Sequence, residues 1–305
     1  MDRLDAMRLF ARVVERRSFT KAARDLEVPR STATQVIKQL EDRLGVRLLQ
    51  RTTRTVRSTP DGEAFYRRCL RILDEVEDAE GAFRGADPRG QLRIEVQGTL
   101  ARHFVMSAIP QFLAEHPGIT ISMSEGERWI DVIEEGVDCT LRYGTLQDSD
   151  LVARRVAMLE CITVASPIYV EKFGRPESLD DLANHHAVGW RWITTGAVHP
   201  FQFVDGQHER HVSMAGPLSV TGTESLRQAV LLGLGLAQMP TFHVAADLKE
   251  GSMLRVLADY PVPSAPVSVL YPRNRHLSPR VRLFMNWVVQ QFAAHEAMFS
   301  APRPW

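Results

Sequence analysis

Hydrophobic side chains recur with helical spacing in the segment TKAARDLEVPRSTATQVIKQLEDRLG, residues 20–45. In its second half the apolar positions are separated by four, three and four residues: Ala33, Ile37, Leu40 and Leu44. This spacing predicts a helix over about 30–44 with one buried stripe. Val28-Pro29 separates it from a shorter helix, because proline disfavours helical backbone in the residue before it. Two helices joined by a short turn predict a helix-turn-helix at about residues 19–38.

The face opposite the apolar stripe carries hydroxyl, amide and cationic groups: Arg30, Ser31, Thr32, Thr34, Gln35 and Lys38. Its acids come only at the end, at Glu41 and Asp42. Arg30 suits the hydrogen-bonding edge of guanine, Gln35 that of adenine and Thr32 a thymine methyl group. A helix of this kind is expected to enter the DNA major groove, where early acids would repel phosphates. The alternative is a small helical bundle that only packs.

The next stretch, VRLLQRTTRTVRST, places apolar residues on both sides of a polar turn. It predicts a short two-stranded wing that completes a DNA-binding domain of residues 1–59. Arg51, Thr52 and Arg54 on the wing are expected to contact phosphates, with a solvated surface side chain as the alternative for each. Thr20, at the start of the first helix of the pair, joins the predicted DNA-binding set.

A long helix is predicted next, since Thr59-Pro60 combines a capping residue with a helix-entry proline. Its apolar residues follow a heptad pattern: Phe65, Cys69, Ile72, Val76, Ala79 and Phe83. Such a seam requires a partner seam. Residues 60–86 are therefore expected to form a dimerising linker helix, followed by a hinge at 87–90. The alternative is an amphipathic helix folded onto its own domain.

From residue 91 onward, strands and helices alternate. Strands are expected at LRIEV, ITISMSE, CTLRYG, CITVAS and VSVLYP, and helices over 100–115, 129–135 and 279–292. This alternation predicts an α/β sheet with ligand sites at the carboxyl ends of its strands. Strands near 162–166 and 267–270 are expected to cross between two lobes. Lobe I is predicted at about 91–163 and 267–300, and lobe II at about 164–266.

The charge distribution is asymmetric. Residues 1–58 carry 14 Lys and Arg against 7 Asp and Glu, whereas the remainder carries 23 against 30. A basic N-terminal domain on an acidic body indicates a polyanionic partner for that domain alone. The 305 residues, 44% of them hydrophobic, are enough for packed globular domains. The charged start MDRLDAM and the short apolar runs predict a cytoplasmic protein without membrane contact.

Three cysteines, Cys69, Cys139 and Cys161, lie far apart without a CxxC motif. They are expected to be buried structural thiols, and a thiol-based redox switch is the alternative. The segment Gly233-Leu234-Gly235 lacks the third glycine of a dinucleotide loop, and His208-Glu209-Arg210-His211 lacks zinc-site spacing. No cofactor, metal site or catalytic residue is expected, and the chain is predicted not to be an enzyme.

Together these stretches resemble the LysR-type transcriptional regulators. The resemblance is strongest over SFTKAARDLEVPRSTATQVIKQLEDRLGVRLLQRTTRTVRSTPDGEAFY, continues through EEGVDCTLRYG, VASPIYV and GLGLAQMP, and covers essentially the whole chain. It implies an α+β fold overall. The implied parts are a winged helix-turn-helix, a dimerising linker helix and a two-lobed α/β effector domain, residues 91–305, shaped like type 2 periplasmic binding proteins.

The same resemblance implies a homotetramer, built as a dimer of dimers, that binds double-stranded promoter DNA and a small-molecule effector. RNA polymerase is a further candidate partner. The recognition helix departs from the family pattern, because Arg30 stands where a serine is usual, Gln35 where a basic residue is common, and Val36 where a glutamine is usual. DNA binding is therefore implied, but the operator sequence is not transferable.

For the effector site, the resemblance places a serine or threonine contact at Thr99, beside Leu100. Thr221-Gly222-Thr223-Glu224 fits a capping box that opens a second helix, with ordinary helix caps as the alternative for Thr221 and Thr223. Helix N-termini facing one cleft favour anions, so the expected effector is a small organic anion such as a carboxylate. Arg142 is expected either to pair with that carboxylate or to form a structural ion pair. Trp190, with Trp192, forms either an aromatic wall or ordinary packing.

Two other functions compete with this interpretation. One is an enzyme or a solute-binding protein that uses the α/β half, and the other is the thiol-based redox regulator. The missing catalytic constellation and the charged N-terminus count against the first. The cysteine positions alone leave the second open.

Overall fold

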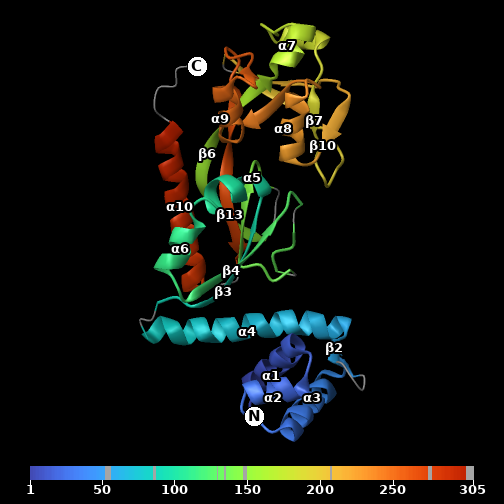
Figure 1. The fold of residues 1–305 in the computed structure, drawn as a ribbon, viewed down its shortest axis with the longest axis vertical. Coiled ribbons are helices and arrows are strands. Elements are labelled where there is room, and N and C mark those ends of the chain that lie inside the picture. The colour runs from blue at the N-terminus through green and yellow to red at the C-terminus, as the bar shows by residue number, and fades with distance from the viewer. Residues whose placement is uncertain are drawn as a thin grey trace. The chain divides into compact units, whose positions relative to one another are not determined.

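In the computed structural model, the described residues are 1–51, 56–84, 87–128, 130–133, 135–146, 150–206, 208–273 and 277–299. They form two compact units (Figure 1). The first comprises residues 1–91 with the short segments 118–120 and 277–280, and the second comprises the rest. Within the described part of the chain, no helix combines the length and apolar character needed to cross a membrane.

The first unit begins with three helices, a two-stranded wing and a long helix: α1 (Arg3–Arg16), α2 (Phe19–Asp25), α3 (Arg30–Leu44), β1 (Leu49–Arg51), β2 (Val56–Ser58) and α4 (Pro60–Arg84). The predicted helix over 30–44 and the predicted antiparallel wing are confirmed. Local signals set the boundaries. Ser18 caps α2 by accepting a hydrogen bond from the Lys21 N–H, and Thr59 caps α4 by accepting one from the Gly62 N–H. Gly45 ends α3 with a φ of 71°, which favours glycine.

Helices α1, α2 and α3 enclose one hydrophobic core. Ala33, Ile37 and Leu40 from α3 are buried in it, whereas Leu44 is 39% exposed. The predicted apolar stripe is therefore buried as far as Leu40 but not at Leu44, the last residue of α3. The rest of the core comes from the other helices and the wing: Leu9, Phe10, Val13, Phe19, Ala22, Ala23, Leu48, Leu49 and Cys69.

The first turns of α4 belong to this same core. Cys69 is fully buried in it, and the ring of Phe65 lies 5.4 Å from that of Phe10. The predicted intersubunit seam is thus corrected at Cys69, because contacts within its own chain already cover that side chain. Ile72 and Ala79 further along are exposed, and Val76 is half-buried. The side chain of Phe83 lies outside the described residues.

The remaining elements alternate strands and helices, as predicted. The strands are β3 (Gly90–Val96), β4 (Ile119–Glu125), β5 (Cys139–Tyr143), β6 (Leu151–Ala165), β7 (Val188–Trp190), β8 (Phe201–Asp205), β9 (His208–Val212), β10 (Leu218–Val220), β11 (Ala237–Pro240), β12 (Leu254–Arg255) and β13 (Val262–Pro272). The helices are α5 (Gly98–Leu100), the π-helix η1 (Ala101–Val105), α6 (Ile109–Glu115), α7 (Pro167–Phe173), the 3-10 helix η2 (Asp180–Asn184), α8 (Thr223–Leu231), α9 (Thr241–Glu250) and α10 (Pro279–Phe299).

A seven-stranded sheet forms the frame of the second unit, in the order β11-β6-β13-β5-β3-β4, with β12 also paired to β6. The long strands β6 and β13 pair antiparallel, and their ladder shifts register between Val262 and Ala265 and again between Val267 and Ser268. On one side β13 continues to β5 and β3, within predicted lobe I. On the other side the end of β6 pairs with β11 and β12, within predicted lobe II.

Two helices differ from the predictions. The helix expected over 100–115 is interrupted, because the Met106 N–H bonds to the Ala101 carbonyl five residues back and forms a π-helical turn. The helix expected over 129–135 is wrong, since its described residues form turns. The Asp131 side chain accepts a hydrogen bond from the Ile133 N–H at 2.8 Å, which favours a turn over a helix.

Candidate functional site

The polar face of α3 is the first candidate site. Four of its predicted residues are exposed: Arg30, Ser31, Gln35 and Lys38. Thr32 and Thr34 are half-buried, and the Thr34 hydroxyl donates to the Arg30 carbonyl at 3.0 Å. Thr20 on α2 is exposed as well. Because the opposite face of α3 is buried in the core, this face is held outward as a continuous row of hydrogen-bonding groups.

The acids at the end of α3 do not disturb that row. Glu41 accepts hydrogen bonds from the backbone N–H groups of Leu48, at 2.8 Å, and Leu49, at 3.0 Å. Its carboxylate therefore fixes the start of the wing against α3. Asp42 is exposed at the far end of the helix from Arg30.

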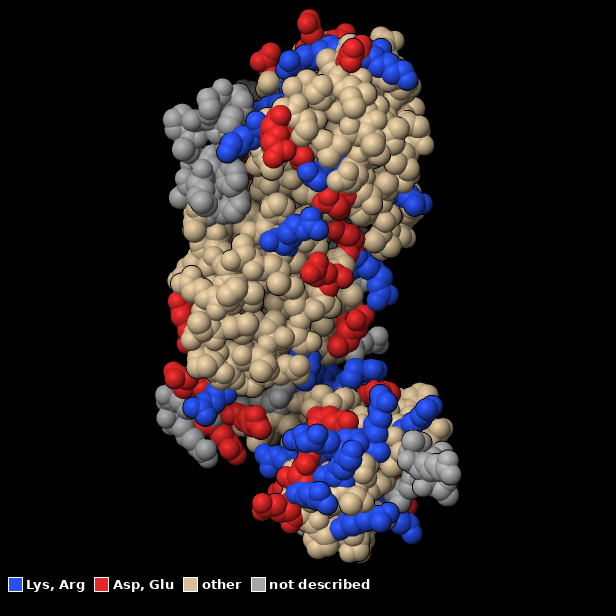
Figure 2. All heavy atoms as spheres, viewed as in Figure 1, with Lys and Arg blue, Asp and Glu red and all other residues tan. Residues whose placement is uncertain are grey.

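Basic side chains gather on the surface of the first unit. Figure 2 shows them as a blue cluster on the visible face of that unit. A surface of this kind attracts polyanions and makes the affinity for nucleic acid depend on salt. Among the predicted wing contacts, Arg51 is the last residue of β1. The side chain of Arg51, and all of Thr52 and Arg54, lie outside the described residues.

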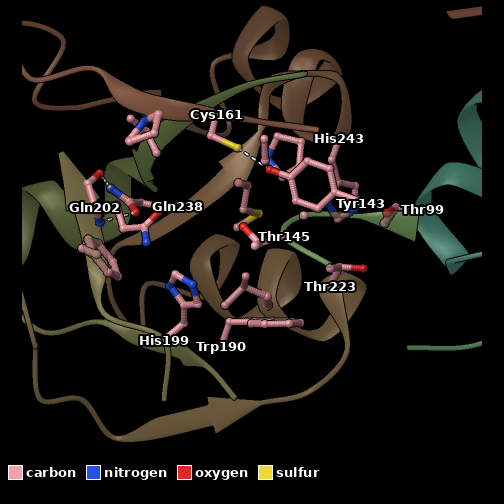
Figure 3. A pocket seen from close by; sticks show the side chains of 18 of the residues that line it. Thr99, Tyr143, Thr145, Cys161, Trp190, His199, Gln202, Thr223, Gln238 and His243 are labelled. Carbon is pink, nitrogen blue, oxygen red and sulfur yellow. Dashed lines mark hydrogen bonds between the residues drawn. The ribbon is translucent and has the colours of Figure 1, made fainter. Parts of the chain in front are cut away.

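The second candidate site is a cavity of about 210 Å³ in the second unit (Figure 3). Predicted lobe I contributes residues at or just after the ends of β3 and β5: Gln97, Thr99, Tyr143 and Thr145. Predicted lobe II contributes residues from β7 through α9: Trp190, Trp192, His199, Gln202, Thr223, Gln238 and His243. The cavity is thus assembled from both lobes. It includes three of the predicted effector residues, Thr99, Trp190 and Thr223.

One wall of the cavity is aromatic. The rings of Trp190 and Trp192 meet edge to face with their centroids 4.9 Å apart, and the His199 ring lies 5.6 Å from Trp192. Trp190 therefore combines the two alternatives left open by the sequence, an aromatic wall and ordinary packing, because it lines the cavity and packs on Trp192. Tyr143 adds a further ring, and its hydroxyl shares a hydrogen bond with the Cys161 sulfur.

Two glutamines connect strands β8 and β11. The Gln202 N–H donates to the side-chain oxygen of Gln238 at 2.9 Å, and the Gln238 amide donates back to the Gln202 carbonyl at 2.8 Å. Only backbone atoms of Gln202 take part in these bonds. Its side chain also lines the cavity (Figure 3).

Arg142 does not line this cavity. Its guanidinium is buried in an ion pair with Glu95 at 2.7 Å, and it donates to the backbone carbonyls of Gly126 and Arg128. Thr140 donates a hydrogen bond to the same Glu95 carboxylate. Burial raises the pKa of Glu95, although Thr140 and Arg142 act in the opposite direction. The expectation that Arg142 takes a ligand carboxylate is corrected to the structural alternative, because Glu95 already occupies it.

Arg142 instead borders a smaller, neighbouring cavity of about 30 Å³, together with Glu127. The Glu127 carboxylate accepts hydrogen bonds from the Gln97 amide at 2.6 Å and from the Thr223 hydroxyl at 3.4 Å. Burial raises its pKa, while these two hydrogen bonds lower it. Since Gln97 and Thr223 belong to opposite predicted lobes, this carboxylate connects them.

Three other effector predictions change. Leu100 is fully buried and does not line either cavity, because its side chain packs into the core. Thr221 lines neither cavity. The predicted capping box is wrong, since α8 begins after Gly222 without a side-chain cap. The Glu224 carboxylate is used by other groups, including Arg227 at 3.0 Å and Arg102 at 3.4 Å.

His243 lines the cavity from α9 and is tied to the same carboxylate. Its Nε2 lies 3.3 Å from a carboxylate oxygen of Glu224, and Arg227 next to it bonds Asp247 at 2.7 Å. Burial lowers the pKa of His243, although Glu224 acts to raise it. The imidazole is therefore neutral at pH 7, and its Nε2–H group donates a hydrogen bond to the Glu224 carboxylate.

The three cysteines are buried. Burial raises the pKa of Cys69 to about 12 and that of Cys161 to about 11, and it raises the pKa of Cys139 further. Thiols with such pKa values are poor nucleophiles, because the thiolate is the reactive form. This favours the structural role over the redox alternative. Among the described residues, no group of three or more His, Cys, Asp or Glu side chains is placed to hold a metal ion.

Sequence reasoning missed Gln97, Tyr143, Gln202 and His243. A usable signal existed for Gln202 and Gln238, since each is a polar residue inside an otherwise apolar strand, FQFVD and AQMP. No such signal marks Tyr143, because a tyrosine at the end of a strand is common packing. No signal marks His243 either. It lies beside Phe242 among the buried residues of α9, and a single histidine on a helix does not indicate a binding site.

Comparisons with known proteins cover both units. A family model described as "Bacterial regulatory helix-turn-helix protein, lysR family" matches residues 4–63, and one described as "LysR substrate binding domain" matches residues 85–293. The chain is 36% identical to YhjC, an uncharacterized HTH-type transcriptional regulator of Escherichia coli, over 94% of this chain and 97% of that protein. It is 35% identical to an HTH-type transcriptional repressor of Pseudomonas aeruginosa, over 99% and 96% of the two chains.

Among solved structures, CrgA from Neisseria meningitidis, described as a LysR-type transcriptional regulator, is similar with a TM-score of 0.60 and 31% identity. The match covers 94% of this chain and 98% of that chain. With the elements described above, these likenesses confirm the predicted fold class, a winged helix-turn-helix with a long helix and a two-lobed α/β domain.

Proposed function

Since this chain belongs to the LysR family of transcriptional regulators, we propose that it is a homo-oligomeric, sequence-specific DNA-binding regulator in the cytoplasm, controlled by a small molecule bound between the lobes. Its relatives are named as transcriptional regulators rather than enzymes. The observation that carries the proposal is the outward row of groups on α3, because its residue types match base edges and phosphates.

In the proposed complex, the start of α3 enters the major groove. Arg30 donates two hydrogen bonds to a guanine, Gln35 reads an adenine, and Lys38 contacts a phosphate. The helix is held by the buried contacts of Ile37 and Leu40, so these groups approach DNA as one rigid unit. Neutral hydroxyls on the same face, such as Ser31, add contacts without repelling phosphates.

A mobility-shift titration with the DNA upstream of its own gene tests this part. Affinity should fall steeply as salt rises, because each neutralised phosphate releases counterions. Unrelated duplex of equal length is the matched control, and it should bind more weakly. An absent shift, or one that salt leaves unchanged, would contradict the proposal and favour a solute-binding protein.

The effector part rests on the contacts that join the lobes. Glu127 connects Gln97 to Thr223, and Arg102 reaches Glu224 from the other lobe at 3.4 Å. Gln97 and Thr223 also line the cavity, so a ligand that changes their contacts changes the closure of the lobes. The predicted anionic effector loses the support of both features, because Arg142 is paired with Glu95 and the Thr223 hydroxyl, at the N-terminus of α8, already donates to Glu127. A ligand that differs in affinity for the open and closed forms shifts their populations.

Assembly is proposed through the exposed part of α4, at Ile72, Val76 and Ala79. Two DNA-binding domains held in this way would read the half-sites of a partly symmetric operator, and two such dimers would form the tetramer. Ile72→Asp should lower the mass measured by sedimentation equilibrium, because it places a charge in an apolar contact. Ala64→Asp adds the same charge off the predicted seam and should leave the mass unchanged. Equal masses for both variants would place the contact elsewhere.

A further inference from the structure

We propose that the cavity selects an uncharged molecule built on a single flat ring and rejects the corresponding carboxylate. This inference rests on the proposed function, which puts the effector in this cavity, and it replaces the anionic effector expected from the sequence. Four properties of the cavity carry it: the charge of its lining, the state of the nearby ions, its size and its aromatic wall.

No carboxylate, ammonium or guanidinium group is found among the described residues that line the cavity. Their polar groups are amides, hydroxyls and imidazoles. A carboxylate that enters such a site loses its hydration without gaining a cationic partner, and that exchange is unfavourable. An amide or hydroxyl on the ligand, in contrast, finds uncharged partners such as Thr99, Thr145 and Gln202.

The ions nearest to the cavity do not favour an anion either. Arg142, the cation beside the adjoining small cavity, is paired with Glu95 at 2.7 Å and lies beside a second carboxylate, Glu127. Glu127 also holds Gln97, which borders both cavities. A ligand carboxylate would therefore lie near the carboxyl groups of Glu95 and Glu127, and the guanidinium of Arg142 is already paired.

His243 adds no positive charge, because burial lowers its pKa, although the hydrogen bond from its Nε2–H group to Glu224 acts in the opposite direction. Arg102, which faces Glu224 from predicted lobe I, and Arg227, which bonds Asp247, are also already paired. Neither arginine offers an unpaired charge to a ligand, and both are absent from the lining of the cavity.

Size and shape favour one ring. The volume of about 210 Å³ exceeds that of an engineered cavity known to hold benzene, about 150 Å³, by roughly the space of a small substituent. The rings of Trp190, Trp192 and His199 pack together along one side of the cavity. The ring of Tyr143 lies on another side of it, away from Trp190 and His199 (Figure 3). Flat apolar ligands gain from such offset or edge-to-face contacts.

Benzamide and benzoate are the matched probes, since they differ in charge but hardly in shape. Calorimetric titration of the full chain should show benzamide binding at least about tenfold more tightly than benzoate, a difference of about 1.4 kcal/mol. Gln202→Lys should reverse that order, because it places a cation in the cavity while the backbone bonds of residue 202 to Gln238 remain. Gln202→Met, of similar length and uncharged, should keep the original order.

Tighter binding of benzoate by the unmodified chain, or no saturable binding of benzamide at millimolar concentration, would overturn the inference. So would an unchanged order in Gln202→Lys when its thermal unfolding matches that of Gln202→Met. Mobility shifts on the same samples keep the two proposals apart. DNA binding that persists alongside a preference for benzoate refutes only the uncharged ligand, whereas loss of DNA binding in the unmodified chain refutes the regulator itself.

Discussion

The polar face of α3 presents its side chains from one continuous helix, whereas the effector cavity collects its side chains from segments as far apart as Gln97 and Gln238. The two sites also treat arginine differently. Arg30 is exposed and available to a partner, while Arg142 is buried and satisfied by Glu95. The same residue type is therefore exposed in one unit and part of a buried ion pair in the other, and this difference is why we propose recognition only for Arg30.

The two sites also differ in their electrostatics. On the first unit, many exposed cations act together on a distant polyanion, and salt screens them. Around the cavity, the charges cancel in close pairs, so the lining itself is left neutral. A single substitution should therefore affect a different property at each of the two sites. On α3 it should change binding without changing stability, and beside the cavity it should change stability first.

The largest effect is expected for Arg142→Met. Removing one partner of a buried ion pair leaves Glu95 uncompensated, so the second unit should lose about 3–5 kcal/mol of unfolding free energy. Urea denaturation followed by circular dichroism measures this loss. The double variant Arg142→Met with Glu95→Met removes both charges and should recover most of it. Normal stability with lost ligand binding would instead make Arg142 a ligand contact.

A smaller effect, confined to binding, is expected for Arg30→Ala. It should cost about 1–3 kcal/mol at the operator and relax the preference at one base pair, while the unfolding free energy stays constant. Fluorescence anisotropy with single-base operator variants measures both. Arg8→Ala removes an exposed arginine from α1 and serves as the control for general charge. Uniform weakening across all base-pair variants would reassign Arg30 to a phosphate.

The smallest effect concerns His243 and pH. Its pKa is lowered in the folded chain, whereas the unfolded imidazole binds a proton near the ordinary value of 6.5. The unfolded state therefore takes up more protons below pH 6.5, and the free energy of unfolding should fall there by up to about 1.4 kcal/mol per pH unit. That stability is fully present above pH 6.5.

Urea denaturation at pH 7 and at about pH 5.5 compares His243→Gln with the unmodified chain. Glutamine keeps a donor for Glu224 but does not titrate, so the variant should show a shallower loss. His211→Gln, at an exposed position, should behave like the unmodified chain. An identical pH profile for all three would show that His243 is not the titrating group.

The contiguous site was largely predictable because its information is local. The spacing of Ala33, Ile37 and Leu40 defined the buried face of α3, and Pro29 and Gly45 marked its ends. The opposite face then followed from helical geometry alone. What periodicity did not reveal was that Cys69 on α4 packs into the same core, since a heptad pattern does not state which surface covers it.

The cavity was less predictable because its residues meet only after the sheet has formed. Thr99 was predicted from the family resemblance, Thr223 from a helix-capping pattern and Trp190 as part of an aromatic wall. Their neighbours Tyr143, Gln202 and His243 were not predicted. Thr221 does not line the cavity, since Gly222 is the N-cap of α8 and the threonine lies before the helix. Arg142 was ambiguous in sequence, because a partner as distant as Glu95 is visible only in the fold.

The two register shifts between β6 and β13 bear on how the lobes can move. Pro263 and Pro266 lie at or beside these shifts, and a proline has no N–H to give to a neighbouring strand. The crossing strand thus lacks part of its ladder where it passes from one lobe to the other, while β6 beside it carries no proline. Bending between the lobes should therefore concentrate at this part of β13, while β6 keeps the two lobes connected.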